Sequence, residues 1–218
     1  MTRIMPLLPR PGLAVLLGAV VLACAAAAPP DETAPSVMSA PASPVLPRQE
    51  GLVPAGYGTL RQDEVTIALR SGPLLIKVTP LGESVIRLLA PDTYNRLHGL
   101  AEARREEAAS RTVHAPELFL VSFFSYQPDV SFQPEDVQLL HQGQLLRPVG
   151  IFPITSGWGS QRLQQQDNQS ALYAFESPID YDQPFTVRYG AEESEGWRSV
   201  INLLRAERNK VQSRIGGR

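Results

Sequence analysis

The chain has 218 residues, with 20 lysine and arginine residues against 22 aspartate and glutamate residues, so its net charge at pH 7 is −2. This balance argues against nucleic-acid binding, which usually needs a concentrated basic surface. The only cysteine is Cys24, so the chain can form no internal disulfide and no thiolate cluster for a metal. The length suits one domain with tails.

The first residues show the three zones of a secretory signal. Arg3 and Arg10 give a positive start, residues 12–23 (GLAVLLGAVVLA) form an uncharged apolar run, and the small residue Ala23 precedes Cys24. A helix that spans a bilayer needs about 20 apolar residues, so this run is too short for a transmembrane anchor. The pattern therefore predicts a signal peptide over residues 1–23.

The sequence Val21-Leu22-Ala23-Cys24 resembles a lipobox, the motif at which the precursors of bacterial lipoproteins are lipidated and cut. One position departs from the usual pattern, because Leu22 stands where a small residue is more common. The resemblance implies a diacylglycerol on the Cys24 sulfur, cleavage before Cys24 and a further acyl chain on the new amino terminus. Two or more acyl chains anchor a protein stably, whereas one gives only marginal binding.

The same resemblance implies a location in the bacterial cell envelope, with the protein held to a membrane by its lipid. Lipoproteins with aspartate after the cysteine tend to stay on the inner membrane, and this chain has Ala25 there. The resemblance thus favours the outer membrane, with the domain facing the periplasm or the surface. The alternative is an ordinary signal peptide that is cut within residues 23–28 and releases a secreted protein.

Residues 24–55 are rich in alanine, proline and serine and lack the apolar period needed to bury a face. This composition predicts an extended, flexible tether. A β-sandwich domain is expected over residues 56–190, followed by a C-terminal helix within residues 191–218 that packs on the domain.

Short runs of alternating apolar residues predict a series of strands with turns between them. The run at 118–126 is apolar on both faces, so it should be a central strand that is covered on both sides. Residues 141–144 should form a hairpin turn, and Pro148 should mark an edge strand. The predicted strands cover residues 65–70, 74–79, 85–89, 118–126, 137–140, 145–151, 171–176 and 185–189.

Many short strands favour an antiparallel immunoglobulin-like β-sandwich, with a helical crossover and a C-terminal helix. The crossover is predicted over residues 92–110, with Asp92 as its cap. The last helix is predicted at about 195–215, with residues 192–195 at its start. Its apolar stripe consists of Trp197, Val200, Ile201, Leu204, Val211 and Ile215.

The sequence shows no constellation typical of catalysis or metal binding. His98, His114 and His141 lack the spacing of metal ligands, and His141 is expected to be exposed in its turn. Asp180 and Asp182 could share a cation, but a solvated turn is favoured, since prolines bracket them. No enzyme activity, cofactor or metal is therefore predicted.

Two regions are candidates for binding a partner. The loop 155–170 contains Trp158 and Arg162, and tryptophan and arginine are common anchors of protein interfaces. The alternative is that Trp158 closes the end of the sandwich. The basic stretch of the last helix could contact anionic lipid or peptidoglycan, although the helix macrodipole also favours cations there.

These observations predict a non-catalytic, membrane-anchored lipoprotein whose sandwich binds another envelope protein or the cell wall. The alternative is an envelope hydrolase or a carbohydrate-binding protein with a site built from residues distant in the sequence. A pocket that collects such residues would discriminate between the two readings.

Overall fold

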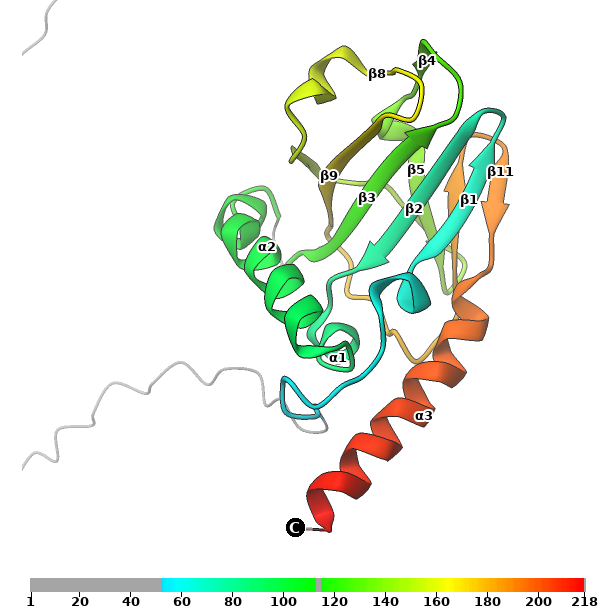
Figure 1. Ribbon diagram of the computed structural model, residues 1–218. Coiled ribbons are helices and arrows are strands. Elements are labelled where there is room, and N and C mark those ends of the chain that lie inside the picture. The colour runs from blue at the N-terminus through cyan, green and yellow to red at the C-terminus, as the bar shows by residue number, and fades with distance from the viewer. Residues whose placement is uncertain (1–51, 113–114, 218) are drawn as a thin grey trace, which may run out of the picture. The chain divides into compact units, whose positions relative to one another are not determined.

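The computed structural model describes residues 52–112 and 115–217, and most of its strands belong to two antiparallel sheets (Figure 1). One sheet has five strands in the order β1-β2-β3-β9-β7, and the other has four in the order β11-β10-β5-β6. The strands are β1 (Ile67–Ser71), β2 (Leu74–Pro80), β3 (Glu117–Ser125), β5 (Val137–His141), β6 (Gln144–Leu146), β7 (Gly150–Pro153), β9 (Asn168–Phe175), β10 (Phe185–Tyr189) and β11 (Glu192–Ser194), with β4 (Val130–Ser131) and β8 (Arg162–Leu163) paired as a separate ribbon.

Three α-helices accompany the sheets in the described part of the chain, including the expected C-terminal helix. They are α1 (Glu83–Ile86), α2 (Pro91–Ala109) and α3 (Trp197–Gly216), with short 3₁₀ helices η1 (Gln62–Val65), η2 (Pro134–Asp136) and η3 (Ser156–Ser160). No helix within residues 52–112 and 115–217 is long and apolar enough to cross a membrane. The mainly antiparallel β character of the chain is confirmed.

The predicted anchor falls outside the described residues. This applies to the signal peptide at 1–23, to Cys24 and to nearly all of the tether at 24–55. These assignments remain predictions.

The two sheets pack face to face through aromatic side chains. Phe119 of β3 meets Phe185 of β10 edge to face, with 6.0 Å between ring centroids. Phe123, further along β3, meets Tyr189 of β10 at 5.8 Å. Edge-to-face ring pairs stabilise a core beyond the area they bury. The side of the five-stranded sheet that faces the other sheet is called its inner face, and the opposite side its outer face.

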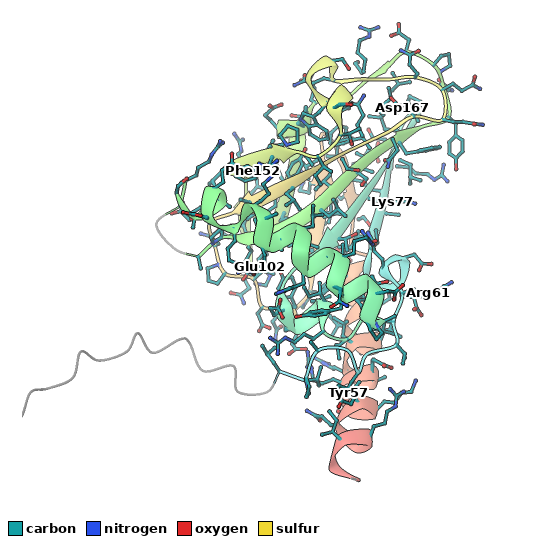
Figure 2. The ribbon with its side chains drawn as sticks, turned by 60° about the vertical axis from the view of Figure 1, so that its left-hand side comes forward. Tyr57, Arg61, Lys77, Glu102, Phe152 and Asp167 are labelled. Carbon is teal, nitrogen blue, oxygen red and sulfur yellow. The ribbon has the colours of Figure 1, made fainter. Side chains whose placement is uncertain are left out.

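Helix α2 covers half of the outer face (Figure 2). Its side chains Tyr94, Leu97, Ala101 and Ala108 are buried along one stripe. The outward-pointing residues beneath are also buried although they face away from the second sheet. They are Leu118 and Leu120 of β3, Phe152 of β7, and Leu172 and Ala174 of β9. The prediction of a central strand at 118–126 is thus confirmed, since β3 pairs with β2 and β9 and is buried on both sides over this half.

Helix α3 presents a buried apolar stripe, as its sequence predicts, except that Ile215 at its end is exposed. Trp197 and Leu204 have no exposed surface, and Ile201 is only 6 % exposed. The Trp197 ring stacks on Phe185 at 4.9 Å, and its indole nitrogen donates a hydrogen bond to the backbone oxygen of Tyr181. The first turns of the helix therefore belong to the same core as the sheets.

The third predicted strand, residues 85–89, is wrong. Its first residues lie in α1, and Val85, Ile86, Leu88 and Leu89 are all fully buried. A half-buried strand would expose alternate residues, so a run buried at neighbouring positions fits a helical turn as well as a strand. Arg87, the polar exception, forms an ion pair with Glu83 four residues earlier, which is the spacing of one helical turn.

The predicted hairpin turn near residue 142 is confirmed, but its second arm differs. Gln142 and Gly143 have φ values of 50° and 76°, as in a two-residue hairpin turn. The run predicted at 145–151 divides at Pro148, which cannot donate a backbone hydrogen bond. Before it, β6 is an edge strand of the four-stranded sheet, and after it β7 is an edge strand of the five-stranded sheet.

Both predicted helix caps are wrong. Helix α2 begins after Ala90, so Asp92 lies inside its first turn and Pro91 occupies the first helical position, a position that suits proline. Residues 192–194 form strand β11 beside β10, and α3 begins only after Gly196.

Candidate functional site

The half of the outer face that α2 leaves open carries a groove. The groove has two adjoining hollows of about 510 and 260 Å³ that share Lys77 of β2 and Ser122 of β3. We call the combined feature the outer groove. It is lined by Gln62, Asp63, Thr66, Ala68, Lys77, Thr79 and Ser122 in its larger part and additionally by Leu75, Phe124, Tyr126 and Asn168 in its smaller part.

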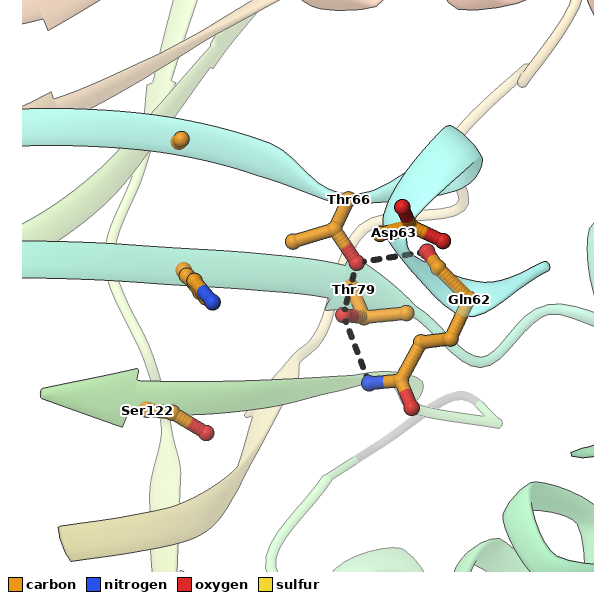
Figure 3. A pocket seen from close by; sticks show the side chains of 7 residues that line it. Gln62, Asp63, Thr66, Thr79 and Ser122 are labelled. Carbon is orange, nitrogen blue, oxygen red and sulfur yellow. Dashed lines mark hydrogen bonds between the residues drawn. The ribbon is translucent and has the colours of Figure 1, made fainter. Parts of the chain in front are cut away.

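Hydroxyl and amide groups build the larger hollow (Figure 3). The hydroxyl oxygen of Thr66, the residue between η1 and β1, is 2.7 Å from that of Thr79 in β2. The Thr66 hydroxyl also lies 2.7 Å from the backbone oxygen of Gln62, and the Gln62 amide donates to Thr79. On the next strand the Ser122 hydroxyl bonds to that of Ser170, at 2.7 Å. These links hold the small polar side chains in fixed positions, which is how binding sites fix a ligand's orientation.

Aromatic rings form the wall of the smaller hollow. Phe124 and Tyr126 meet edge to face, with centroids 4.6 Å apart. Tyr126 is 55 % exposed, an unusual state for so large a ring. Asn168 and Leu75 complete this wall. A ring held by a second ring and open to solvent on its other side is a ready contact surface for a ligand.

Lys77 lies where the two hollows meet, and Figure 2 shows it on the sheet between Arg61 and Asp167. Its direct neighbours across the strands are Ala68 and Ser122, which are small. Within residues 52–112 and 115–217 no carboxylate forms an ion pair with it. The ammonium group is therefore available to a ligand.

A second polar cluster lies beside α2 and holds the helix in place. Glu83 accepts hydrogen bonds from Arg87 and His98, and the His98 ring stacks on Tyr94. Burial alone would raise the pKa of Glu83, but the bonds from Arg87 and His98 outweigh it and lower that pKa. This cluster joins α1 to α2 and reads as structural.

Glu117 and Tyr181 form a buried pair at the start of β3. The Tyr181 hydroxyl donates to a Glu117 carboxylate oxygen at 2.8 Å. Burial raises the pKa of Glu117, with the Tyr181 bond opposing it in part, and burial also raises the pKa of Tyr181. A hollow of about 230 Å³ adjoins the pair beneath α2. Glu83 and Arg105 line the same hollow, and both are bonded within the protein, Glu83 to Arg87 and His98 and Arg105 to Glu102.

The two residues predicted to bind a partner lie in different settings. Trp158 is only 6 % exposed, and its ring contacts those of Phe123, Phe132 and Tyr173. It closes one end of the core, which favours the structural alternative. Arg162 is exposed, and its guanidinium forms an ion pair with Asp129 at 2.6 Å.

The histidines form no shared site in the described part of the chain, where no group of three potential metal ligands occurs. His98 belongs to the Glu83 cluster. His141 was expected to be exposed, but it is the last residue of β5 and only 6 % exposed, because the turn begins one residue later. His114 lies outside the described residues.

Asp180 and Asp182 are held by protein groups. The Asp180 carboxylate accepts the backbone N–H of Asp182, and the Asp182 carboxylate pairs with Arg208 of α3 at 3.1 Å. Other cations of this helix are engaged as well, since Arg205 donates to the Asp182 backbone and Arg214 to the Tyr57 backbone. These basic residues tie α3 to neighbouring loops.

Sequence reasoning missed the outer groove. Its residues come from η1, β1, β2, β3 and β9 and are common polar types at separate points of the chain. One signal was present, because Lys77 is one of only two lysines and stands at the outward position of an otherwise apolar strand.

Comparison with protein-family models, curated proteins and solved structures found no match to this chain. Its function is therefore argued from the geometry above.

Proposed function

We propose that this protein is a non-catalytic, membrane-anchored envelope lipoprotein that binds another envelope component, a protein or the cell wall, through the outer groove. The observation that carries the proposal is the contrast across one sheet face. Where α2 covers it, the face is apolar. Where it is open, it holds hydrogen-bonded hydroxyls, the exposed ring of Tyr126 and a lysine without a carboxylate partner in the described residues. Pockets with convergent polar groups are the default binding sites of a protein.

The anchor is the first part of the proposal. The resemblance of Val21-Leu22-Ala23-Cys24 to a lipobox supports lipidation of Cys24. A tether over residues 24–55 would let the domain reach partners at a distance from the membrane. The outer membrane, facing the periplasm or the surface, is the proposed location.

We propose an immunoglobulin-like sandwich only in the sense that two antiparallel sheets pack face to face. The face-to-face ring contacts between the two sheets support it. Strand order differs from that of an immunoglobulin domain, where the third strand joins the second sheet. Here β3 stays beside β2 in the first sheet.

The alternative is a hydrolase, and one feature of the outer groove bears on it. Lys77 is directly paired with Ser122 across β2 and β3, and some hydrolases use a serine with a lysine as base. A catalytic lysine is normally buried so that its ammonium group gives up a proton. Lys77 is exposed, and the Ser122 hydroxyl is already bonded to Ser170. We therefore favour binding over catalysis.

Lipidation is tested with Cys24→Ser. Cells that express the full chain should incorporate a fatty-acid probe into the wild type and none into the variant, because the thioether needs the Cys24 sulfur. Gel fluorescence after labelling measures this. Equal labelling of the two chains would exclude the anchor.

The binding face is tested by photocrosslinking in intact cells. A photoreactive residue at Ser122 of the outer groove should give adducts that the same residue at Gln138 does not. Gln138 is a matched control because it is half-buried on β5 of the other sheet. Adding Lys77→Gln should reduce the Ser122 adducts, and adducts of equal pattern at both positions would contradict the proposal.

A further inference from the structure

We propose that the ligand of the outer groove is a carboxylate-bearing glycan strand of the cell wall. This inference rests on the proposed function and names the chemistry of the partner. Two cations without a carboxylate partner, the exposed ring of Tyr126 on the half-buried ring of Phe124, and a set of hydroxyl and amide groups carry it.

The charge comes from neighbouring strands. Lys77 of β2 is paired with Ala68 of β1, and Arg70 lies two residues beyond Ala68 on the same outward face. Diagonal neighbours of this kind are about 7–8 Å apart. Both side chains are exposed, so both head groups can reach one carboxylate or two successive ones.

These two cations differ from most others in the described residues. Neither Lys77 nor Arg70 has a carboxylate partner there. Most other cations in the described residues form an ion pair within the protein, as in Arg61–Asp63, Arg162–Asp129, Arg188–Glu193, Arg208–Asp182 and Lys210–Glu207. Two unpaired cations on one open face are complementary to an anionic ligand.

The rings indicate what else the ligand contains. Tyr126 is 55 % exposed, and Phe124 supports it edge to face. The C–H faces of sugar rings pack on such aromatic surfaces, while the phenol oxygen can bond to a sugar hydroxyl.

Hydroxyl and amide groups lie on both sides of Lys77 along the groove. Thr66, Ser122 and Asn168 can each donate and accept hydrogen bonds, as sugar hydroxyls do. Thr79 is buried beneath them and bonds to Thr66 and Gln62. Along β2, Thr79 to Leu75 spans four residues, or roughly 13 Å. That is the length of a short oligosaccharide, so a glycan strand would lie along the groove and not end in it.

A protein partner fits these features less well. Protein interfaces are centred on large buried anchors, whereas the open face offers mainly small polar side chains around Lys77. A lipid headgroup would contact the two cations but would make no use of the Tyr126 ring or of the hydroxyl groups that line the outer groove. Both alternatives appear as outcomes of the test.

The test uses the full chain purified in detergent and two probes. One probe is peptide-free glycan strands of peptidoglycan, which keep their lactyl carboxylates. The other is the same strands with these carboxylates converted to methyl amides. Calorimetric titration should give at least tenfold weaker binding for the amide, and wild-type binding of the acid should weaken as salt is raised.

The variants assign the effect to residues. The double variant Arg70→Gln, Lys77→Gln should bind the acid at least tenfold more weakly and the amide unchanged, because only the acid presents the charge. Tyr126→Ala should weaken both probes. Arg147→Gln is the matched control, since Arg147 is also exposed and lies between β6 and β7, away from β1 and β2.

Equal binding of the two probes, or equal loss in Arg147→Gln, would overturn the inference. Binding of phosphatidylglycerol vesicles that depends on Arg70 and Lys77, with no glycan binding, would overturn it in favour of a lipid headgroup. If no glycan binds but Ser122 crosslinks specifically to a protein in cells, the inference fails and the proposed function stands. If Ser122 gives no specific adduct either, both fail.

Discussion

The outer face of the five-stranded sheet is one surface with two unlike halves. Under α2 it presents leucines, alanine and phenylalanine, all buried. Beyond α2 it presents threonine, serine, lysine, asparagine and aspartate, together with Leu75, Phe124 and Tyr126. Strand β3 crosses both halves, so its outward residues change from Leu118 and Leu120 to Ser122. The same strands run through both halves, and the change in side-chain type separates the surface that packs beneath α2 from the proposed binding surface.

The largest effect is expected from Leu97→Ala in α2, which tests whether the covered half of the outer face contributes more to stability than the open half. Leu97 has no exposed surface, and large-to-small changes at such sites cost about 2–5 kcal/mol. Chemical denaturation should show that loss in the free energy of unfolding. Leu75→Ala, in the open half, is the matched control and should cost far less because Leu75 is only half-buried. Similar losses would mean that the two halves are not distinct.

Leu204→Ala extends the test to α3, which packs away from this face. Leu204 is fully buried, so the same loss of about 2–5 kcal/mol is expected. Thermal melting of the full chain measures it, with Ile215→Ala as the control, since Ile215 is 36 % exposed. A melting temperature unchanged by Leu204→Ala would show that α3 is not part of the core.

A smaller effect is expected from Glu83→Gln, which weakens the polar attachment of α2. Hydrogen bonds to charged groups contribute about 1.5–3 kcal/mol, so the variant should lose stability of that order at pH 7. The folded-state pKa of Glu83 lies below its ordinary value of 4.5. Its contribution is therefore present above pH 4.5 and is lost as the pH falls through the lowered pKa. Denaturation at several pH values measures the difference, and a loss that grows toward acid would contradict the assignment.

The smallest effect concerns the open half itself. Lys77→Gln should change the free energy of unfolding by no more than about 0.5 kcal/mol, since exposed residues outside packed contacts rarely matter more. The same variant is expected to weaken ligand binding. A large loss of stability would indicate that Lys77 has a structural partner, and it would argue against a role for Lys77 in binding a ligand.

How much of the fold the sequence predicted depended on the hydrophobic period of each segment and on whether one side of the segment is exposed. Strand 74–79 alternates cleanly, and helix 92–110 repeats at helical spacing, so both were predicted nearly to their ends. Residues 85–89 are apolar and fully buried except for Arg87, and a run of neighbouring buried residues cannot distinguish a strand from a helix.

The candidate sites were harder to predict, for a different physical reason. Trp158 has the residue type of an interface anchor, but only three-dimensional packing decides whether an aromatic ring faces the core or the solvent. Ser122, Thr79 and Asn168 are ordinary residues alone, and strand pairing brings them together. The register in which distant strands pair is fixed only in the folded protein, so it could not be predicted from this single sequence.

The edges of the five-stranded sheet determine how readily copies of this protein associate when they are close together. At one edge, β7 is only four residues long and ends in Pro153, while Val149 and Ile154 beside it are exposed. At the other, the Ser194 hydroxyl of β11 bonds to the backbone oxygen of Ala68 in β1. Long unpaired edges recruit strands from other copies, and a short edge with a proline resists this. If the proposed lipid anchor holds the protein at a membrane surface, its copies would meet often, and this edge chemistry would let them stay dispersed at high surface density.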